Sequence, residues 1–165
     1  MPEKETIERA REDEREGKAA STQAGEFVRE EMDHIREGKH GARSTKQAIA
    51  IGLSKARRAG VKLAPLKQGT ASAKTRADAK RATAAGKKGA SKVSSTRSKA
   101  ASAALKREGR SAASPKALSK QAKSAAAKRT ASSRSAAAKK GAQTKGPKVR
   151  SAAARKAART RAKSS

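Results

Sequence analysis

The fold is decided by residues 21–60, which read STQAGEFVREEMDHIREGKHGARSTKQAIAIGLSKARRAG. In the first half, apolar side chains recur every three to four residues, which is the period of one face of an α-helix, and Glu31 interrupts this stripe. Gly38 is a residue type that ends helices, and Ser44-Thr45-Lys46-Gln47 has the form of a capping box that starts the next one. The pattern predicts two helices joined by a loop, a helical hairpin.

The predicted core of this hairpin is small. The apolar faces of the two helices carry few large side chains, and Gly60 and Val61 have the form of a helix stop followed by a hydrophobic contact. We expect one set of side chains to pack together: Phe27, Val28, Met32 and Ile35 against Ile49, Leu53 and the segment 61–63. Because such a core is marginal for a monomer, a homodimer through the hairpin remains an open alternative.

Charge divides the chain into three parts. The formal net charge is +29, but residues 1–40 hold 8 basic and 12 acidic side chains. Residues 41–70 hold 7 basic and no acidic side chains, and residues 71–165 hold 28 basic side chains against Asp78 and Glu108. We therefore predict an acidic N-terminal segment (1–20), a helical hairpin module (21–66) and a low-complexity tail rich in Lys, Arg, Ala and Ser (67–165).

The tail has too little apolar surface for a core of its own. Its only aliphatic side chains larger than Ala are Val93, Leu105, Leu118 and Val149. Burial of so few groups does not offset the entropy of ordering the chain, although alanine favours helix and Ser114-Pro115 is a strong helix start. The predicted fold class is mainly α: a short helical hairpin with a long tail that is disordered or only conditionally helical.

Composition excludes several classes of protein. There is no Cys, so disulfides and thiol chemistry are excluded, and no apolar run approaches a membrane span. The charged N-terminus does not have the form of a signal peptide. His34 and His40 would need carboxylates such as Glu37 to hold zinc, and a pair of solvated helix-end histidines is the simpler interpretation. We predict no enzyme activity, cofactor, metal, small-molecule substrate or membrane partner.

A tail of this charge predicts a polyanionic partner. Phe27 is the only aromatic residue, so no platform for stacking unpaired bases exists, and this favours double-stranded DNA bound through its phosphates. The prediction is a histone-like, nucleoid-associated cytoplasmic protein that coats and compacts DNA without sequence preference. RNA or ribosome binding, and a stress protein whose hairpin binds another protein, are the alternatives. The predicted nucleic-acid contacts are Lys46, Lys55, Arg57, Arg58, Lys87, Lys88, Lys106, Arg107, Arg110, Lys116, Lys120, Lys123, Lys128, Arg129, Lys139, Lys140, Lys148, Arg150, Arg155, Lys156, Arg159 and Arg161.

Two stretches resemble known families. The segment 32–38, MDHIREG, followed by 44–60, STKQAIAIGLSKARRAG, resembles small basic bacterial proteins with an uncharacterised helical domain, which pair M-x-x-[FI]-x-x-G with S-x-K-Q-A-I-A-I-x-L-S-x-A-R. That resemblance implies a bacterial origin and no activity. The tail is similar to a linker-histone C-terminal domain, with Ser114-Pro115-Lys116 matching the core triplet, and this resemblance implies DNA coating and compaction.

Overall fold

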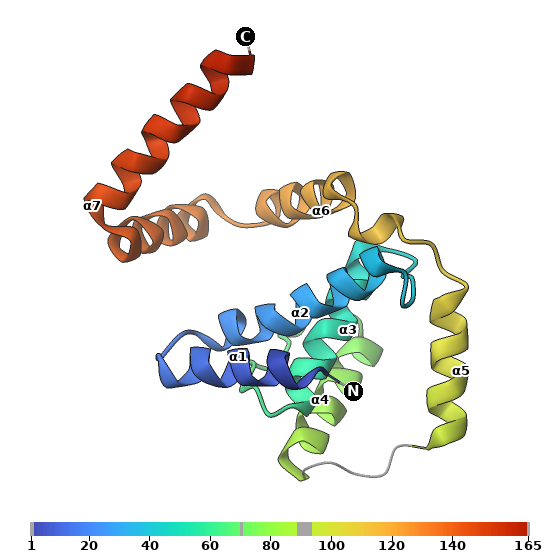
Figure 1. Cartoon of the computed structure of the whole chain (residues 1–165). Helices are drawn as coiled ribbons and strands as arrows, with labels where there is room; N and C mark the ends of the chain where they lie inside the picture. The colour runs from blue at the N-terminus through green and yellow to red at the C-terminus, as the bar shows by residue number, and fades with distance from the viewer. Residues whose placement is uncertain (1, 70, 89–93, 165) are drawn as a thin grey trace. The chain divides into compact units, whose positions relative to one another are not determined.

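The described residues form helices and the loops between them, with no strand among residues 2–69, 71–88 and 94–164 of this computed structural model (Figure 1). None of the helices in these ranges is both long and apolar enough to cross a membrane. The helices are α1 (Lys4–Arg15), α2 (Ala20–Glu37), α3 (Thr45–Arg58), α4 (Ala73–Lys88), α5 (Ser95–Lys106), the short 3-10 helix η1 (Ser111–Ala113), α6 (Pro115–Ala127) and α7 (Ala131–Ser164).

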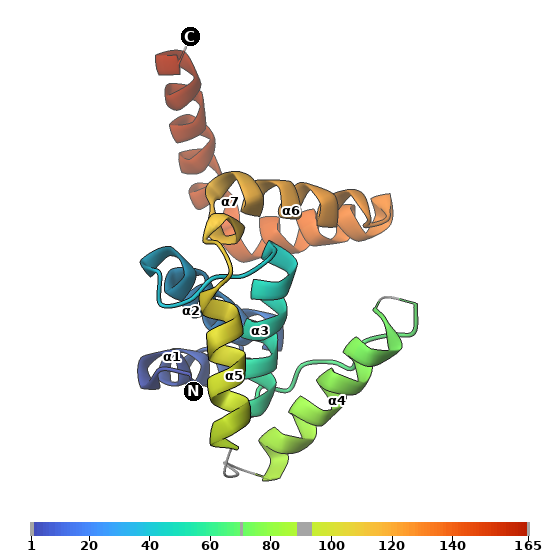
Figure 2. The ribbon, with the colours of Figure 1, turned by 90° about the vertical axis from the view of Figure 1, so that its right-hand side faces the viewer.

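The chain divides into two compact units, residues 1–121 and 122–165. In the first unit α2 is central, because it packs against both α1 and α3. Helix α4 packs against α3, and η1 contacts both α2 and α3 (Figure 2). The expectation of a short hairpin is therefore wrong, because the α2–α3 pair is covered by three further elements.

Two apolar clusters hold the first unit together, and α2 contributes to both. The predicted core side chains all belong to one or the other cluster. The first consists of Met32, Ile35, Ala42, Ala48, Ala112 and Ala113 with Val28, Ile49 and Leu118 against it. The second consists of Ala10, Ala24, Phe27 and Ala56 with Ile7, Leu53, Val61 and Leu63 against it. The clusters also contain residues from α1 and from the region after α5, which the hairpin prediction omitted.

Local sequence signals place the helix ends as predicted. Ser44 caps α3, because its hydroxyl accepts a hydrogen bond from the backbone N–H of Gln47 at 3.2 Å. The side chain of Gln47 reaches back to the N–H of Arg43, one residue before the expected target. Gly38 ends α2 in the left-handed conformation with φ of 79°, and Ser114 caps α6 by accepting from the N–H of Ala117. These contacts satisfy backbone groups that helix ends leave unpaired.

Helices α2 and α3 meet closely at Gly52. A methyl group placed on its Cα would lie 2.7 Å from the Cα of Val28 and 3.0 Å from the carbonyl oxygen of Phe27. Only glycine allows the two backbones to approach this far without a shift. The small residues of α3 therefore serve helix packing as well as the apolar face.

Part of the predicted tail is packed within the first unit. The N–H of Gly41 donates to the carbonyl of Leu105 at 2.9 Å, and the N–H of Ala42 donates to the carbonyl of Gly109 at 3.1 Å. The hydroxyl of Thr45 donates to the carbonyl of Ala112 at 2.7 Å. The loop between α2 and α3 thus obtains its backbone partners from a segment more than sixty residues later, and this segment belongs to the core.

The second unit is helical although its described side chains are not buried. Within α7, Gly146 has φ of 66° and precedes Pro147, so the helix is interrupted there. Thr130 caps the start of α7 by accepting from the N–H of Ser133. The expectation of a long disordered tail is therefore wrong. Alanine-rich sequence with capped ends favours helix more strongly than repulsion between the cations opposes it.

Candidate nucleic-acid interface

The second unit carries many exposed cations. Residues 122–165 contain 14 Lys and Arg and no acidic residue. Every predicted contact in this unit has an exposed side chain. They are Lys123, Lys128, Arg129, Lys139, Lys140, Lys148, Arg150, Arg155, Lys156, Arg159 and Arg161.

Most of the predicted contacts in the first unit are exposed as well. They lie near the start of α3, at the ends of α3, α4 and α5, in the segment before η1, and on α6. The members of this group are Lys46, Arg58, Lys87, Lys88, Lys106, Arg107, Arg110, Lys116 and Lys120. These residues remain available for a polyanion, and their role in binding one stays a prediction.

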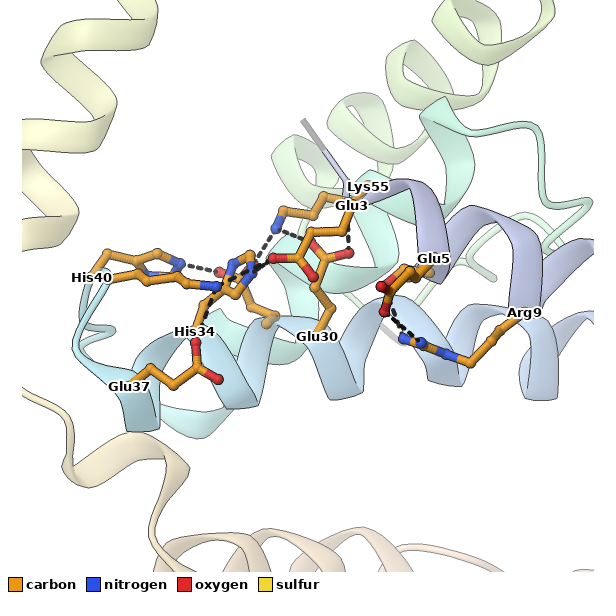
Figure 3. Close-up of polar contacts among 11 residues, drawn as sticks. Glu3, Glu5, Arg9, Glu30, His34, Glu37, His40 and Lys55 are labelled. Atoms are coloured by element: carbon orange, nitrogen blue, oxygen red, sulfur yellow. Dashed lines mark hydrogen bonds and ion pairs between the residues drawn. The ribbon is translucent and has the colours of Figure 1, made fainter.

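Lys55 is placed elsewhere. Its Nζ lies 2.9 Å from Oε1 of Glu30 and 2.8 Å from Oε2 of Glu31, inside the contact between α2 and α3 (Figure 3). Burial acts to lower the pKa of Lys55, but the close carboxylates of Glu31 and Glu30 outweigh it, so the pKa is raised. The ammonium is held by two carboxylates, and we remove Lys55 from the predicted interface.

Arg57 is only 8% exposed and lines a groove beside α4. Its guanidinium donates to the carbonyl of Leu53 at 3.4 Å. The groove has a volume of about 470 Å³, and its lining combines cations with apolar groups of the segment 63–66 and of α4. The lining residues are Arg57, Leu63, Pro65, Leu66, Arg76, Ala79, Lys80, Thr83, Ala84 and Lys87. Arg57 thus faces other cations of the first unit.

Carboxylates on α2 are held by contacts from three parts of the chain. Glu30 is 4% exposed, and its Oε2 accepts from the backbone N–H of Glu3 at 3.1 Å. Burial acts to raise the pKa of Glu30, but the hydrogen bonds from Lys55, from this N–H and from Thr6 outweigh it, so the pKa is lowered. The start of α1 is therefore tied to α2 through a buried carboxylate (Figure 3).

The two histidines are mostly buried, not solvated at the helix end as expected. The side chains of His34 and His40 are 13% and 15% exposed, and their rings meet edge to face with centroids 6.0 Å apart. Oε1 of Glu3 lies 2.9 Å from Nε2 of His34, and this hydrogen bond, followed by the one from Lys39, lowers the pKa of Glu3. Glu37, the carboxylate expected beside them, pairs instead with Lys39 at 3.0 Å.

The buried charges on α2 and α3 were missed, although two signals could have found them. Glu31 interrupts the apolar stripe of α2, so it occupies a position that faces the core. Lys55 lies seven residues after Ala48, which places both on the same face of α3. An acid and a base on the facing sides of two adjacent helices predict an ion pair between them.

Comparison with known proteins gives one similarity. A family model described as a family of unknown function (DUF6496) matches residues 4–68, which hold α1, α2, α3 and the loop that follows. No curated protein and no solved structure matches the chain. The matched region contains both segments of the motif pair described above, and the family description assigns no activity.

Proposed function

We propose that this protein binds double-stranded DNA without sequence preference and compacts it, acting through the exposed cations of residues 122–165. The observation that carries the proposal is that these 44 residues hold 14 Lys and Arg, no acid and no buried side chain among those described. A segment with no core of its own and this charge is suited to neutralising a polyanion. Association with the bacterial nucleoid follows as part of the same proposal.

The spacing of the cations on α7 supports this mode of binding. Lys148, Arg155 and Arg159 are seven and four residues apart, so they form one stripe along the helix. At 1.5 Å per residue, their Cα atoms are separated by about 10 Å and about 6 Å along the axis. A DNA duplex carries one negative charge per about 1.7 Å of its axis, so each of these cations meets phosphates without any fixed register.

The side chains between the cations support close approach to a backbone. In α7 they are mainly Ala and Ser, which are too small to hold the helix away from a phosphate chain. The only aromatic side chain, Phe27, is fully buried in the second apolar cluster. Base stacking, the usual mode for single strands and RNA loops, therefore has no aromatic partner, and this favours a duplex.

The test is the salt dependence of binding to unrelated DNA duplexes of equal length. Each phosphate contact contributes about −0.9 to the slope of log K against log salt. The triple variant Lys148→Gln, Arg155→Gln and Arg159→Gln should therefore make the slope shallower by about 2.7. Glutamine keeps a high helix propensity, so the comparison isolates charge.

The matched control removes three exposed cations from the acidic helix α1: Lys4→Gln, Arg11→Gln and Arg15→Gln. It changes the net charge equally and should leave the slope within about one contact of the wild type. Equal losses in both variants would show that net charge alone drives binding and would overturn the assignment to residues 122–165. Stronger binding to structured RNA than to duplex DNA at every salt concentration would contradict the choice of DNA.

A further inference from the structure

Three potential metal ligands converge where α2 ends. Glu31 and His34 are three residues apart on α2, so they share one face of the helix. After Gly38 reverses the chain, His40 turns back toward that face (Figure 3). One ligand atom from each of Glu31, His34 and His40 lies within 4.8 Å of the others.

The distance between two ligand atoms of this group fits a metal. Nε2 of His40 lies 3.4 Å from Oε1 of Glu31. Zinc binds nitrogen and oxygen at about 2.0–2.2 Å in tetrahedral sites, where two ligand atoms are about 3.4 Å apart. The His40 and Glu31 atoms are therefore separated by the distance between two ligands of one zinc ion.

The carboxylate of Glu31 is buried and shares the ammonium of Lys55 with Glu30. Its side chain is 1% exposed, and neither carboxylate oxygen has a hydrogen bond of acceptable geometry among the described residues. Lys55 lies 2.8 Å from Oε2, but the same ammonium also serves Glu30, so one positive charge faces two carboxylates. Buried polar groups are nearly always satisfied, and Oε1, which faces His40, is the atom left over.

Both imidazoles contact groups outside the cluster, and for His34 the group is Oε1 of Glu3, 2.9 Å from its Nε2. Nδ1 of His40 lies 3.1 Å from the carbonyl of Gly41, and donation to that oxygen leaves the Nε2 lone pair toward Glu31. Gly41 is itself fixed, because its N–H donates to Leu105 and a Cβ there would overlap the backbone of Glu108. Histidine ligands of metals are commonly oriented by such a hydrogen bond through the second ring nitrogen.

From these contacts we propose that Glu31, His34 and His40 form a zinc-binding site that clamps the end of α2 to the loop before α3. Two nitrogens and one carboxylate oxygen suit Zn²⁺, whereas Mg²⁺ and Ca²⁺ take sets of oxygen ligands. Oε1 of Glu3, beside His34, supplies a further negative charge at the edge of the site. The site is independent of the DNA contacts proposed above, because none of its members is an exposed cation.

The test is titration of the full chain with ZnCl₂ alone, after treatment with a chelator that is then removed. We expect one zinc ion per chain, a higher melting temperature with zinc, and no comparable effect of Mg²⁺. His40→Gln and Glu31→Gln should each weaken zinc binding by about tenfold or more. Co²⁺ in place of Zn²⁺ should give the strong visible absorption of a tetrahedral site in the wild type and lose it in both variants.

Glu37→Gln is the matched control, because it removes the same charge from the same helix outside the cluster. It should bind zinc like the wild type. Far-ultraviolet circular dichroism checks that each variant is folded. If Glu31→Gln unfolds, the zinc affinity of His40→Gln alone tests the site. The absence of saturable one-to-one binding, or undiminished binding by folded His40→Gln, would overturn the site.

Discussion

The regions 4–68 and 122–165 are both helical, but different interactions stabilise their helices. In the first, Phe27 and Ile35 have no solvent exposure, and ion pairs join α1 to α2 and α2 to α3. In the second, every described side chain is at least partly exposed, and Val149, the largest apolar group, is 57% exposed. The first is stabilised by packing between helices, and the second by alanine propensity and helix caps.

Because of this difference, the assignment of a residue to a helix does not by itself show whether its substitution will change the free energy of unfolding. Where packing stabilises a helix, one side chain can carry a large share of the free energy of unfolding. Where local propensity stabilises it, the free energy is spread over many residues, and single surface changes have small effects. The two regions should therefore respond differently to the same kind of substitution.

The largest expected effect is the loss of the Phe27 ring. Phe27→Ala leaves a cavity in the second apolar cluster and should lower the free energy of unfolding of the first unit by about 3–5 kcal/mol. Val149→Ala, the control in the second unit, should change it by no more than about 0.5 kcal/mol. Thermal and urea melting of the full chain, followed by circular dichroism, measures both, and equal effects would remove the distinction between the regions.

A smaller effect is expected at the close approach of α2 and α3. Gly52→Ala places a methyl group against Val28 and should cost about 1–3 kcal/mol through displacement of the helices. Gly25→Ala is the matched control, because a methyl group there meets no atom within 4 Å, and it should stabilise α2 by about 0.5–1 kcal/mol. Urea melting should therefore give changes of opposite sign in the free energy of unfolding for the two variants. A stabilising Gly52→Ala would contradict the close approach of α2 and α3 at Gly52.

The smallest expected effect is a dependence on pH that comes from the buried charges. The pKa of Glu30 is lowered from 4.5, so its contribution to stability is present above pH 4.5 and is lost as the pH falls through the folded value. The pKa of Lys55 is raised from 10.5, so its contribution is present below pH 10.5 and is lost as the pH rises through the folded value.

Between these limits we expect the contribution of the pair to be constant. Because a single carboxylate is involved, the loss of stability in acid should be smaller than the effect of either core substitution. The side chain of the Glu30→Gln variant cannot titrate, so the free energy of unfolding of this variant should fall less steeply in acid than that of the wild type. Melting from pH 3 to pH 7 measures how the free energy of unfolding of each protein depends on pH. Equal slopes would show that the loss of stability in acid comes from groups other than Glu30.

The sequence predicted what depends on side-chain period and caps. The apolar faces of α2 and α3, the stop at Gly38 and the starts at Ser44 and Pro115 are all visible in short windows of residues. The docking of η1 was not predictable in this way. Ala112 and Ala113 are two among many alanines of the basic region, and the bonds that hold this segment involve backbone groups of any residue type.

Of the proposed DNA contacts, the sequence predicted the exposed cations of α7 but misplaced Lys55. Exposure is the default for Lys and Arg in a segment without a core, so that prediction needed no tertiary information. Lys55 required the knowledge that Glu30 and Glu31 face it across the α2–α3 contact. Similarly, the ligand proposed beside the histidines is Glu31 rather than Glu37, because the helix period places Glu31 toward His40.

The bonds between the α2–α3 loop and residues 105–113 also impose an order on synthesis. At the ribosome, the N–H groups of Gly41 and Ala42 and the hydroxyl of Thr45 emerge 64 to 67 residues before their acceptors Leu105, Gly109 and Ala112. At about 5–20 residues per second this interval lasts on the order of 3–13 s. During that time these donors must rely on water, so the junction between α2 and α3 lacks its partners from residues 105–112 until that segment has been made.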